Sequence, residues 1–87
     1  MSVPRAQIID AVRNYVLGEF LPGEAPETLS NTTPLITGGV LDSISTVKLV
    51  MFLETEFGVE LQPHEISPDF LDTVDDIATL VAERVKP

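Results

Sequence analysis

The stretch from Gly38 to Phe57 constrains the fold most, because it joins a glycine pair, a helix cap and a long apolar segment. Its apolar side chains recur at three- and four-residue spacing, which predicts a helix from Ser43 to Phe57. Asp42 is the expected N-cap, since its carboxylate can accept hydrogen bonds from the free amides of the first turn. Gly58 is the expected stop. Ser43 then takes the first helical position, exposed at a loop-to-helix junction.

The apolar arc of this predicted helix is wider than one buried face requires. We expect one stripe to face the core, and it consists of Thr46, Leu49, Val50, Leu53 and Phe57. A neighbouring stripe consists of Ile44, Val47 and Met51. If exposed, this second stripe is a contact surface beside Ser43, with a spacing that suits docking of a helix into a groove. The alternative is that the long preceding loop buries it, and we favour the contact surface.

Two further helices are predicted from the same periodicity. The first begins at Pro4 and ends near Pro22, with an apolar face of Ile8, Ile9, Val12, Val16 and Phe20 and an opposite polar face of Asp10, Arg13, Asn14 and Glu19. The last is capped by Thr73 and carries two acidic residues in its first turn. Its inner face is expected to contain Val74, Ile77, Leu80, Val81 and Val85, and its last turn the basic residues Arg84 and Lys86.

The segments between the helices are rich in turn-forming residues. Residues 21–41 form a long first loop, which we expect to be pinned to the core by Leu29, Leu35 and Ile36. After the central helix we expect an extended link at 59–61, a turn at 63–66 and a short helix at 68–71, with core contacts from Ile66, Phe70 and Leu71. The predicted fold is one all-α domain over residues 1–87, a small four-helix bundle of three main helices plus one short helix.

Composition narrows the possible partners. The formal charge of −9 argues against nucleic acid and anionic membrane surfaces, and favours basic partners. The chain has no cysteine, and no uninterrupted apolar stretch is long enough to span a bilayer. No secretory signal pattern opens it. We therefore expect a soluble cytoplasmic monomer with modest stability, because a chain of 87 residues buries a limited core.

Residue patterns typical of enzymes are lacking. The single histidine, His64, follows a proline in a polar linker and pairs with no serine or cysteine motif. There is no nucleophile elbow, phosphate-binding glycine loop or EF-hand spacing. A cluster of acidic residues allows a weak divalent-cation site, but a solvated acidic face is the favoured interpretation; the cluster is Asp69, Asp72, Asp75 and Asp76. We expect a protein that is not an enzyme.

The central stretch also carries a family resemblance. The run Asp42-Ser43-Ile44, preceded by Gly39-Val40-Leu41, resembles the phosphopantetheine attachment segment of acyl and peptidyl carrier proteins. The triplet alone is a weak motif, but the glycines before it, the apolar helix ending in Glu56-Phe57 and the downstream run Phe70-Leu71-Asp72-Thr73-Val74 strengthen it. The resemblance extends from about Tyr15 to the C-terminus.

The resemblance implies a bundle of acyl-carrier type and a shuttle function. Ser43 would carry 4'-phosphopantetheine, transferred from coenzyme A by a phosphopantetheinyl transferase with Mg²⁺, and Asp42 would belong to the attachment motif. Acyl, aminoacyl or peptidyl groups would then ride as thioesters, loaded by a ligase or synthase. The helix after Ser43 would meet partner enzymes through Ile44, Val47, Lys48, Met51 and Glu54.

Some residues depart from the pattern of fatty-acid carriers. Lys48 stands where many of them have an acidic residue, Thr55 interrupts an expected acidic run, and Val40-Leu41 is unusually apolar. These departures favour a specialised role, as in secondary metabolism, over housekeeping fatty acid biosynthesis. The alternative is an unmodified helical adaptor that binds a partner through Ile44, Val47 and Met51. Ser43→Ala separates the two hypotheses, since only a carrier needs the hydroxyl.

Overall fold

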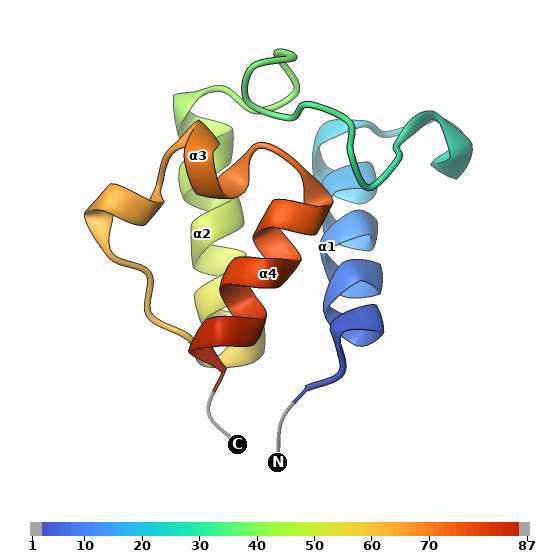
Figure 1. The fold of residues 1–87 in the computed structure, drawn as a ribbon. Helices are drawn as coiled ribbons and strands as arrows, with labels where there is room; N and C mark the ends of the chain where they lie inside the picture. The colour runs from blue at the N-terminus through green and yellow to red at the C-terminus, as the bar shows by residue number, and fades with distance from the viewer. Residues whose placement is uncertain (1–2, 86–87) are drawn as a thin grey trace.

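The computed structural model describes residues 3–85, and Figure 1 shows how three main helices are arranged in it. The main helices are α1 (Arg5–Phe20), α2 (Ser43–Phe57) and α4 (Val74–Arg84); α3 (Pro68–Leu71) is short, and two 3-10 turns are η1 (Pro26–Thr28) and η2 (Pro63–Glu65). The described residues form no strand. α1 runs toward the loop end of the bundle, whereas α2 and α4 run away from it. The predicted all-α bundle of three main helices and one short helix is confirmed.

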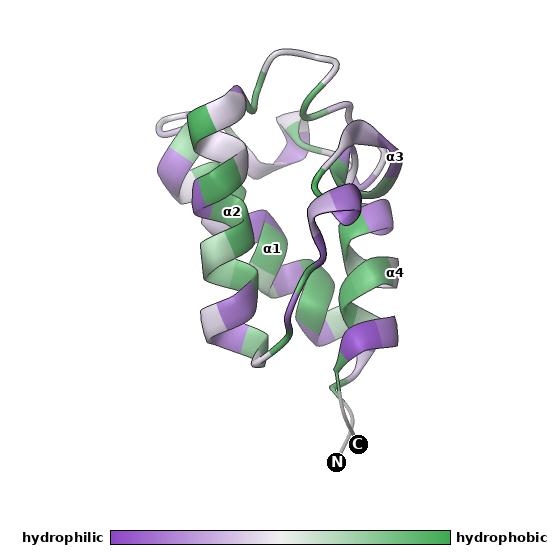
Figure 2. Cartoon of the chain, turned by 90° about the vertical axis from the view of Figure 1, so that its left-hand side faces the viewer, coloured by the Kyte–Doolittle hydropathy of each residue, from purple (hydrophilic) through white to green (hydrophobic). Residues whose placement is uncertain are grey.

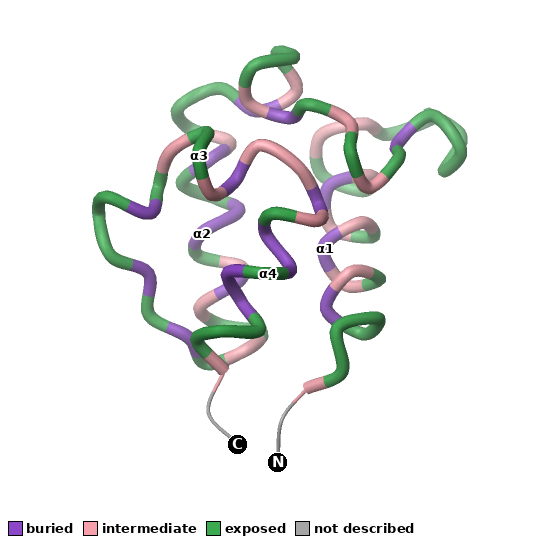
Figure 3. Tube along the Cα trace, in the orientation of Figure 1, coloured by how far each residue is buried: buried purple, intermediate pink, exposed green. Residues whose placement is uncertain are grey.

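The core lies between the three main helices, whose buried segments face one another in Figure 3. It contains apolar side chains of α1, α2 and α4, among them Ile8, Val12, Val16, Leu49, Val50, Leu53, Val74, Ile77 and Val81. Phe57 and Val85 are only partly buried, at its margin. The predicted inner faces are thus confirmed, because apolar residues at helical spacing come together on one side of each helix. The predicted place of Lys86 falls outside the described residues.

The long first loop crosses one end of the bundle in Figure 1 and is pinned by apolar side chains. Leu29 and Leu35 are buried as predicted, Ile36 packs at the margin of the core, and Leu41 is a further buried pin. Buried apolar area of this kind offsets part of the entropy cost of ordering a long loop.

Arg13 has a different role from the one predicted. Instead of lying free on the outer polar face of α1, its guanidinium donates hydrogen bonds to the loop carbonyls of Pro26, at 2.9 Å, and of Leu29. A guanidinium presents several donors in a fixed plane, so one side chain can satisfy several loop carbonyls at once. Arg13 therefore ties the loop to α1.

The segment between α2 and α4 contains a buried carboxylate, paired with a half-exposed arginine, that the sequence did not predict. Glu65 is only 1% exposed; its Oε1 accepts a hydrogen bond from the Gln62 amide at 2.9 Å, and its Oε2 pairs with Arg84. The expectation that Ile66 contacts the core is wrong, because its side chain is 38% exposed. Glu65 takes the inward position of this turn, held by Arg84, and the next residue turns outward.

Among the described helices, none has the length and apolar character needed to cross a membrane.

Candidate functional site

The N-terminus of α2 places Ser43 as predicted. Asp42 has an extended backbone (φ −89°, ψ −171°), and its Oδ1 accepts a hydrogen bond from the Ser45 amide at 2.7 Å. The backbone carbonyl of Asp42 accepts a hydrogen bond from the Thr46 hydroxyl at 2.7 Å. The first helical turn therefore binds both the side chain and the backbone of Asp42. Hydrogen bonding from Ser45 lowers the pKa of the Asp42 carboxyl. Ser43 is exposed at the first helical position.

The backbone that leads to Ser43 has a defined conformation. Gly39 has φ +85°, which favours glycine. At Gly38, an added Cβ would clash with the carbonyl oxygen of Pro34, so a glycine is required for this close approach. The Leu41 amide then donates to the Leu35 carbonyl at 2.8 Å, which closes the loop just before the cap. The glycine pair thus fixes the path to Ser43.

Asp72, at the junction of α3 and α4, fastens this loop. Its carboxylate accepts hydrogen bonds from the Ile36 amide (2.8 Å), the Thr37 amide (2.9 Å) and the Thr37 hydroxyl (2.8 Å). Its carbonyl accepts from the Leu35 amide at 2.6 Å. These bonds, led by that of the Thr37 amide, lower the pKa of the Asp72 carboxyl. One residue of the α3–α4 junction therefore positions the segment that precedes Ser43.

A groove with a volume of about 460 Å³ opens beside Ser43. Its lining comes from the long loop, the first turns of α2 and the start of α3 with the two residues before it, and consists of Ile36, Leu41, Asp42, Ser43, Thr46, Val47, Ile66, Ser67 and Pro68. Sequence reasoning missed the groove, since Ile66, Ser67 and Pro68 are distant in the chain from the first turns of α2 that they face across it. Ile66, expected in the core, forms part of its wall instead. Ser43 thus lies at the edge of a concave, mostly apolar surface.

The second apolar stripe of α2 is exposed. Ile44 is 70% exposed, Val47 55% and Met51 60%, and Figure 2 shows hydrophobic segments of α2 on the side turned to the viewer. The alternative that the long loop buries the stripe is therefore wrong. We call Ile44, Val47 and Met51 the apolar stripe below. It begins one residue after Ser43 and continues for two turns of the helix.

The two predicted charged contact residues of α2 differ in their surroundings. Lys48 is exposed next to the apolar stripe. Glu54 is partly buried, and its Oε2 accepts a hydrogen bond from the Leu61 amide at 3.3 Å. Glu54 thus has a structural contact of its own, with the link that follows α2. A partner role for either residue stays a prediction.

The acidic cluster after α3 is divided among separate contacts. Asp72 binds the loop, and Asp75 forms an ion pair with Arg5 at 3.7 Å. Within residues 3–85 no three histidine, cysteine, aspartate or glutamate side chains are grouped so that they could hold a metal ion. His64 is exposed, and its ring meets that of Phe70 edge to face at 6.3 Å.

A comparison of the sequence with models of known protein families gave no match, and a comparison with curated proteins gave no significant one.

Proposed function

We propose that this protein is a carrier that bears 4'-phosphopantetheine on Ser43 and shuttles acyl, aminoacyl or peptidyl groups as thioesters between biosynthetic enzymes. The observation that carries the proposal is the geometry of Ser43. It is an exposed hydroxyl at the first position of a capped helix, with a groove on one side and the apolar stripe directly after it. The sequence resemblance of the Asp42-Ser43-Ile44 segment supports the same residue.

The helix start suits a phosphodiester. Free amides and the positive end of the helix dipole favour an anion there by about 0.3–1 kcal/mol. The Asp42 carboxylate is a nearby negative charge, but it is engaged by the Ser45 amide, and solvent screens an exposed pair of charges. When bound, the prosthetic group supplies a thiol for thioester formation, a group that this cysteine-free chain lacks.

The surroundings of Ser43 support the handling of a flexible arm. The groove of about 460 Å³ offers apolar surface from Val47 and Ile66 within reach of the attachment point. Ser67 and Thr46 also line it and have hydroxyl groups. Such a mixed lining can receive an arm that contains both methylene and amide groups. The chain's own residues would thereby shelter the arm between encounters.

The apolar stripe supports transient recognition by partner enzymes. Three large apolar side chains in contact with water favour docking, because transferring their surface from water into an interface lowers the free energy. The charge of −9 steers basic partners toward the molecule, and steered encounters of modest affinity suit a shuttle that must leave each enzyme. The proposed partners are a phosphopantetheinyl transferase and a loading ligase or synthase.

The test is intact-protein mass spectrometry after incubation with coenzyme A, Mg²⁺ and a broad-specificity phosphopantetheinyl transferase. We expect the wild type to gain the mass of one phosphopantetheine and Ser43→Ala to gain none. Ser67→Ala is the matched control, since Ser67 presents another hydroxyl to the same groove. A folded wild-type protein that gains no mass, or a Ser43→Ala variant that still gains it, would overturn the proposal.

An unmodified adaptor is the second candidate, and the exposure of the apolar stripe favours it independently of Ser43. In that case the stripe would pack into a groove of a partner protein, with anchors one and two turns apart. Ser43→Ala would then leave the biological activity intact, whereas Met51→Asp would remove it. A carrier would instead lose all activity with Ser43→Ala while remaining folded, which circular dichroism would show.

A further inference from the structure

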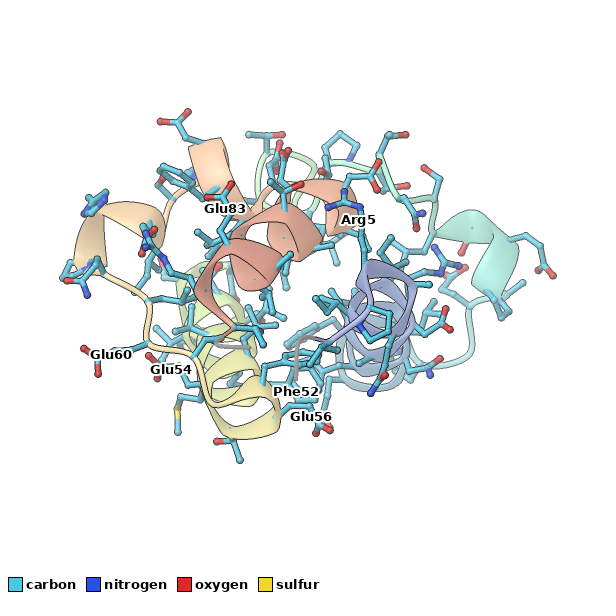
Figure 4. All side chains as sticks on the ribbon, turned by 60° about the horizontal axis from the view of Figure 1, so that its bottom comes forward. Arg5, Phe52, Glu54, Glu56, Glu60 and Glu83 are labelled. Carbon is cyan, nitrogen blue, oxygen red and sulfur yellow. The ribbon has the colours of Figure 1, made fainter. Side chains whose placement is uncertain are left out.

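A second hollow, separate from the groove beside Ser43, lies between α1 and α2. Its volume is about 400 Å³, and it is lined by Ala11, Asn14, Tyr15, Gly18, Glu19, Phe52 and Glu56. Figure 4 shows two of these side chains, Phe52 and Glu56, on the side of α2 that faces α1. Nothing in the proposed carrier function uses this hollow.

Each of the two helices contributes one aromatic ring and one carboxylate to the hollow. Each provides an aromatic ring followed four residues later by a carboxylate, Tyr15 and Glu19 from α1 and Phe52 and Glu56 from α2. Residues four apart lie on the same face of a helix. The rings of Tyr15 and Phe52 stack with centroids 4.1 Å apart and an interplanar angle of 12°. Both carboxylates therefore adjoin a stacked aromatic pair.

The aromatic pair is held in place. The hydroxyl of Tyr15 donates a hydrogen bond to the Lys48 carbonyl of α2 at 3.2 Å, and the ring of Phe20 meets that of Tyr15 edge to face at 5.6 Å. Burial and the negative charge of Glu19 raise the pKa of the Tyr15 phenol. The aromatic side chains of the hollow thus have fixed positions without a ligand, which reduces the conformational entropy lost on binding.

The carboxylates of the hollow have no cationic partner within residues 3–85. The ion pairs there join Arg5 to Asp75 and Arg84 to Glu65, so neither involves Glu19 or Glu56. Two negative charges in one hollow repel each other, and an aromatic face attracts cations through its quadrupole. The chemistry of the hollow is complementary to an organic cation.

Gly18 lines the hollow at a position where the fold itself does not need a glycine. It lies inside α1, where alanine is more stable than glycine, and its φ is not positive. An added Cβ would meet no atom within 4 Å. Neither backbone conformation nor internal packing therefore requires a glycine here. A side chain at this position would, however, project into space that the hollow now leaves open.

We propose that the hollow between α1 and α2 receives an arginine side chain of a partner protein. A guanidinium is planar, so it can stack against an aromatic ring while its N–H groups pair with carboxylates. Glu19 and Glu56 supply the carboxylates, and Tyr15 and Phe52 the aromatic surface. The charge of −9 favours a basic partner. This contact is independent of any group on Ser43.

The binding test uses N-acetyl-L-arginine amide as the probe, titrated into the ¹⁵N-labelled protein and followed by NMR. We expect weak, saturable shifts centred on the amides of Tyr15, Gly18 and Phe52. Glu19→Gln/Glu56→Gln should weaken this binding by at least about tenfold, because the charge-assisted hydrogen bonds are lost. Glu24→Gln/Glu27→Gln is the matched control, with the same change in net charge on exposed loop residues, and should bind as the wild type does.

Gly18→Leu tests the need for open space. We expect it to abolish probe binding while the melting temperature stays equal or rises, since leucine favours the helix more than glycine does. Ser43→Ala should bind the probe unchanged, which separates this proposal from the carrier function. Three results would overturn the proposed arginine site. They are equal binding of the neutral probe N-acetyl-L-norleucine amide, unchanged binding of the arginine probe by Gly18→Leu, and an equal effect of the two double variants.

Discussion

At the scale of single residues, two carboxylates shape the approach to Ser43. Asp42 accepts from an amide three residues ahead, which a helix cap does in any context. Asp72 accepts from Ile36 and Thr37, across 36 and 35 positions of the chain, and so connects the α3–α4 junction to the loop. Both are hydrogen-bonded in their charged form, which explains their lowered pKa values.

Replacing Asp72 should loosen the loop. We expect Asp72→Ala to lower the free energy of unfolding by about 2 kcal/mol, because three hydrogen bonds to a charged acceptor are lost. Asp72→Asn should cost less, since its side-chain carbonyl can still accept from the two amides. Urea denaturation measures both. Asp69→Asn is the control, because its carboxylate is exposed; an equal loss in this control would rule out the specific role of Asp72.

The lowered pKa values also predict the response to acid. The stabilising contributions of Asp42 and Asp72 are complete above the pKa of an unfolded aspartate and are lost as the pH falls through the lower folded pKa. Below about pH 4 the unfolded chain binds more protons, so the free energy of unfolding should decrease as the pH decreases. Urea denaturation at several pH values tests this, and Asp72→Asn should show a shallower dependence than the wild type.

At the scale of secondary-structure elements, glycines have opposite roles in the two helices that flank the hollow. Gly58 ends α2 with φ +65°, and its amide donates to the Glu54 carbonyl at 2.9 Å. This left-handed conformation costs an L-residue energy, so glycine is favoured. Gly18 lies within α1 without such a requirement. The end of α2 thus depends on a glycine, whereas α1 merely tolerates one.

The same substitution should therefore change stability in opposite directions at these two positions. We expect Gly58→Ala to lower the free energy of unfolding by about 1 kcal/mol, through left-handed strain. Gly18→Ala should raise it by about 0.5–1 kcal/mol, through helix propensity. Thermal unfolding of both variants provides the comparison. A loss of stability with Gly18→Ala would mean that the glycine serves internal packing after all.

At the scale of the whole molecule, α2 combines an inner structural face with an outer face that packing does not use. The groove beside Ser43 lies on its α3 side, and the hollow proposed for arginine lies on its α1 side. The apolar stripe extends along the exposed surface of the same helix. The apolar stripe and the buried face of α2 consist of different side chains, so we expect substitutions in the stripe to affect recognition with little effect on stability.

A pair of variants tests this separation. Val47 is 55% exposed, so Val47→Asp should change the free energy of unfolding by less than about 0.5 kcal/mol. It should nevertheless slow phosphopantetheine transfer to Ser43 by about tenfold, as loss of an apolar interface anchor does. Leu53 is fully buried, and Leu53→Ala should cost about 3 kcal/mol. Urea denaturation and a mass-spectrometric time course measure the two effects; a normal transfer rate for Val47→Asp would contradict the proposed surface.

Local signals made much of the fold predictable from the sequence. The bounds of α2, its cap at Asp42 and its stop at Gly58 follow from residues within one or two turns of each other. The exposed position of Ser43 followed from the cap, and the existence of a second apolar stripe followed from the helical period, whereas its exposure was favoured over burial under the loop and settled by the structure. Such predictions succeed because a cap, a glycine stop and an apolar face act on neighbouring residues.

Contacts between distant segments were decided only by the tertiary structure. Arg13 reaches the loop, Glu65 is buried against Arg84, and Ile66 consequently lines the groove. A charged residue in a linker is predicted to be exposed, because its burial requires an oppositely charged or hydrogen-bonding partner. When that partner lies on another element, the sequence pattern does not identify it. The sequence by itself thus determined the helices and the position of Ser43. Packing of the loop and the α3 segment decided the groove, and packing of α1 against α2 decided the hollow, since cavities depend on how elements meet.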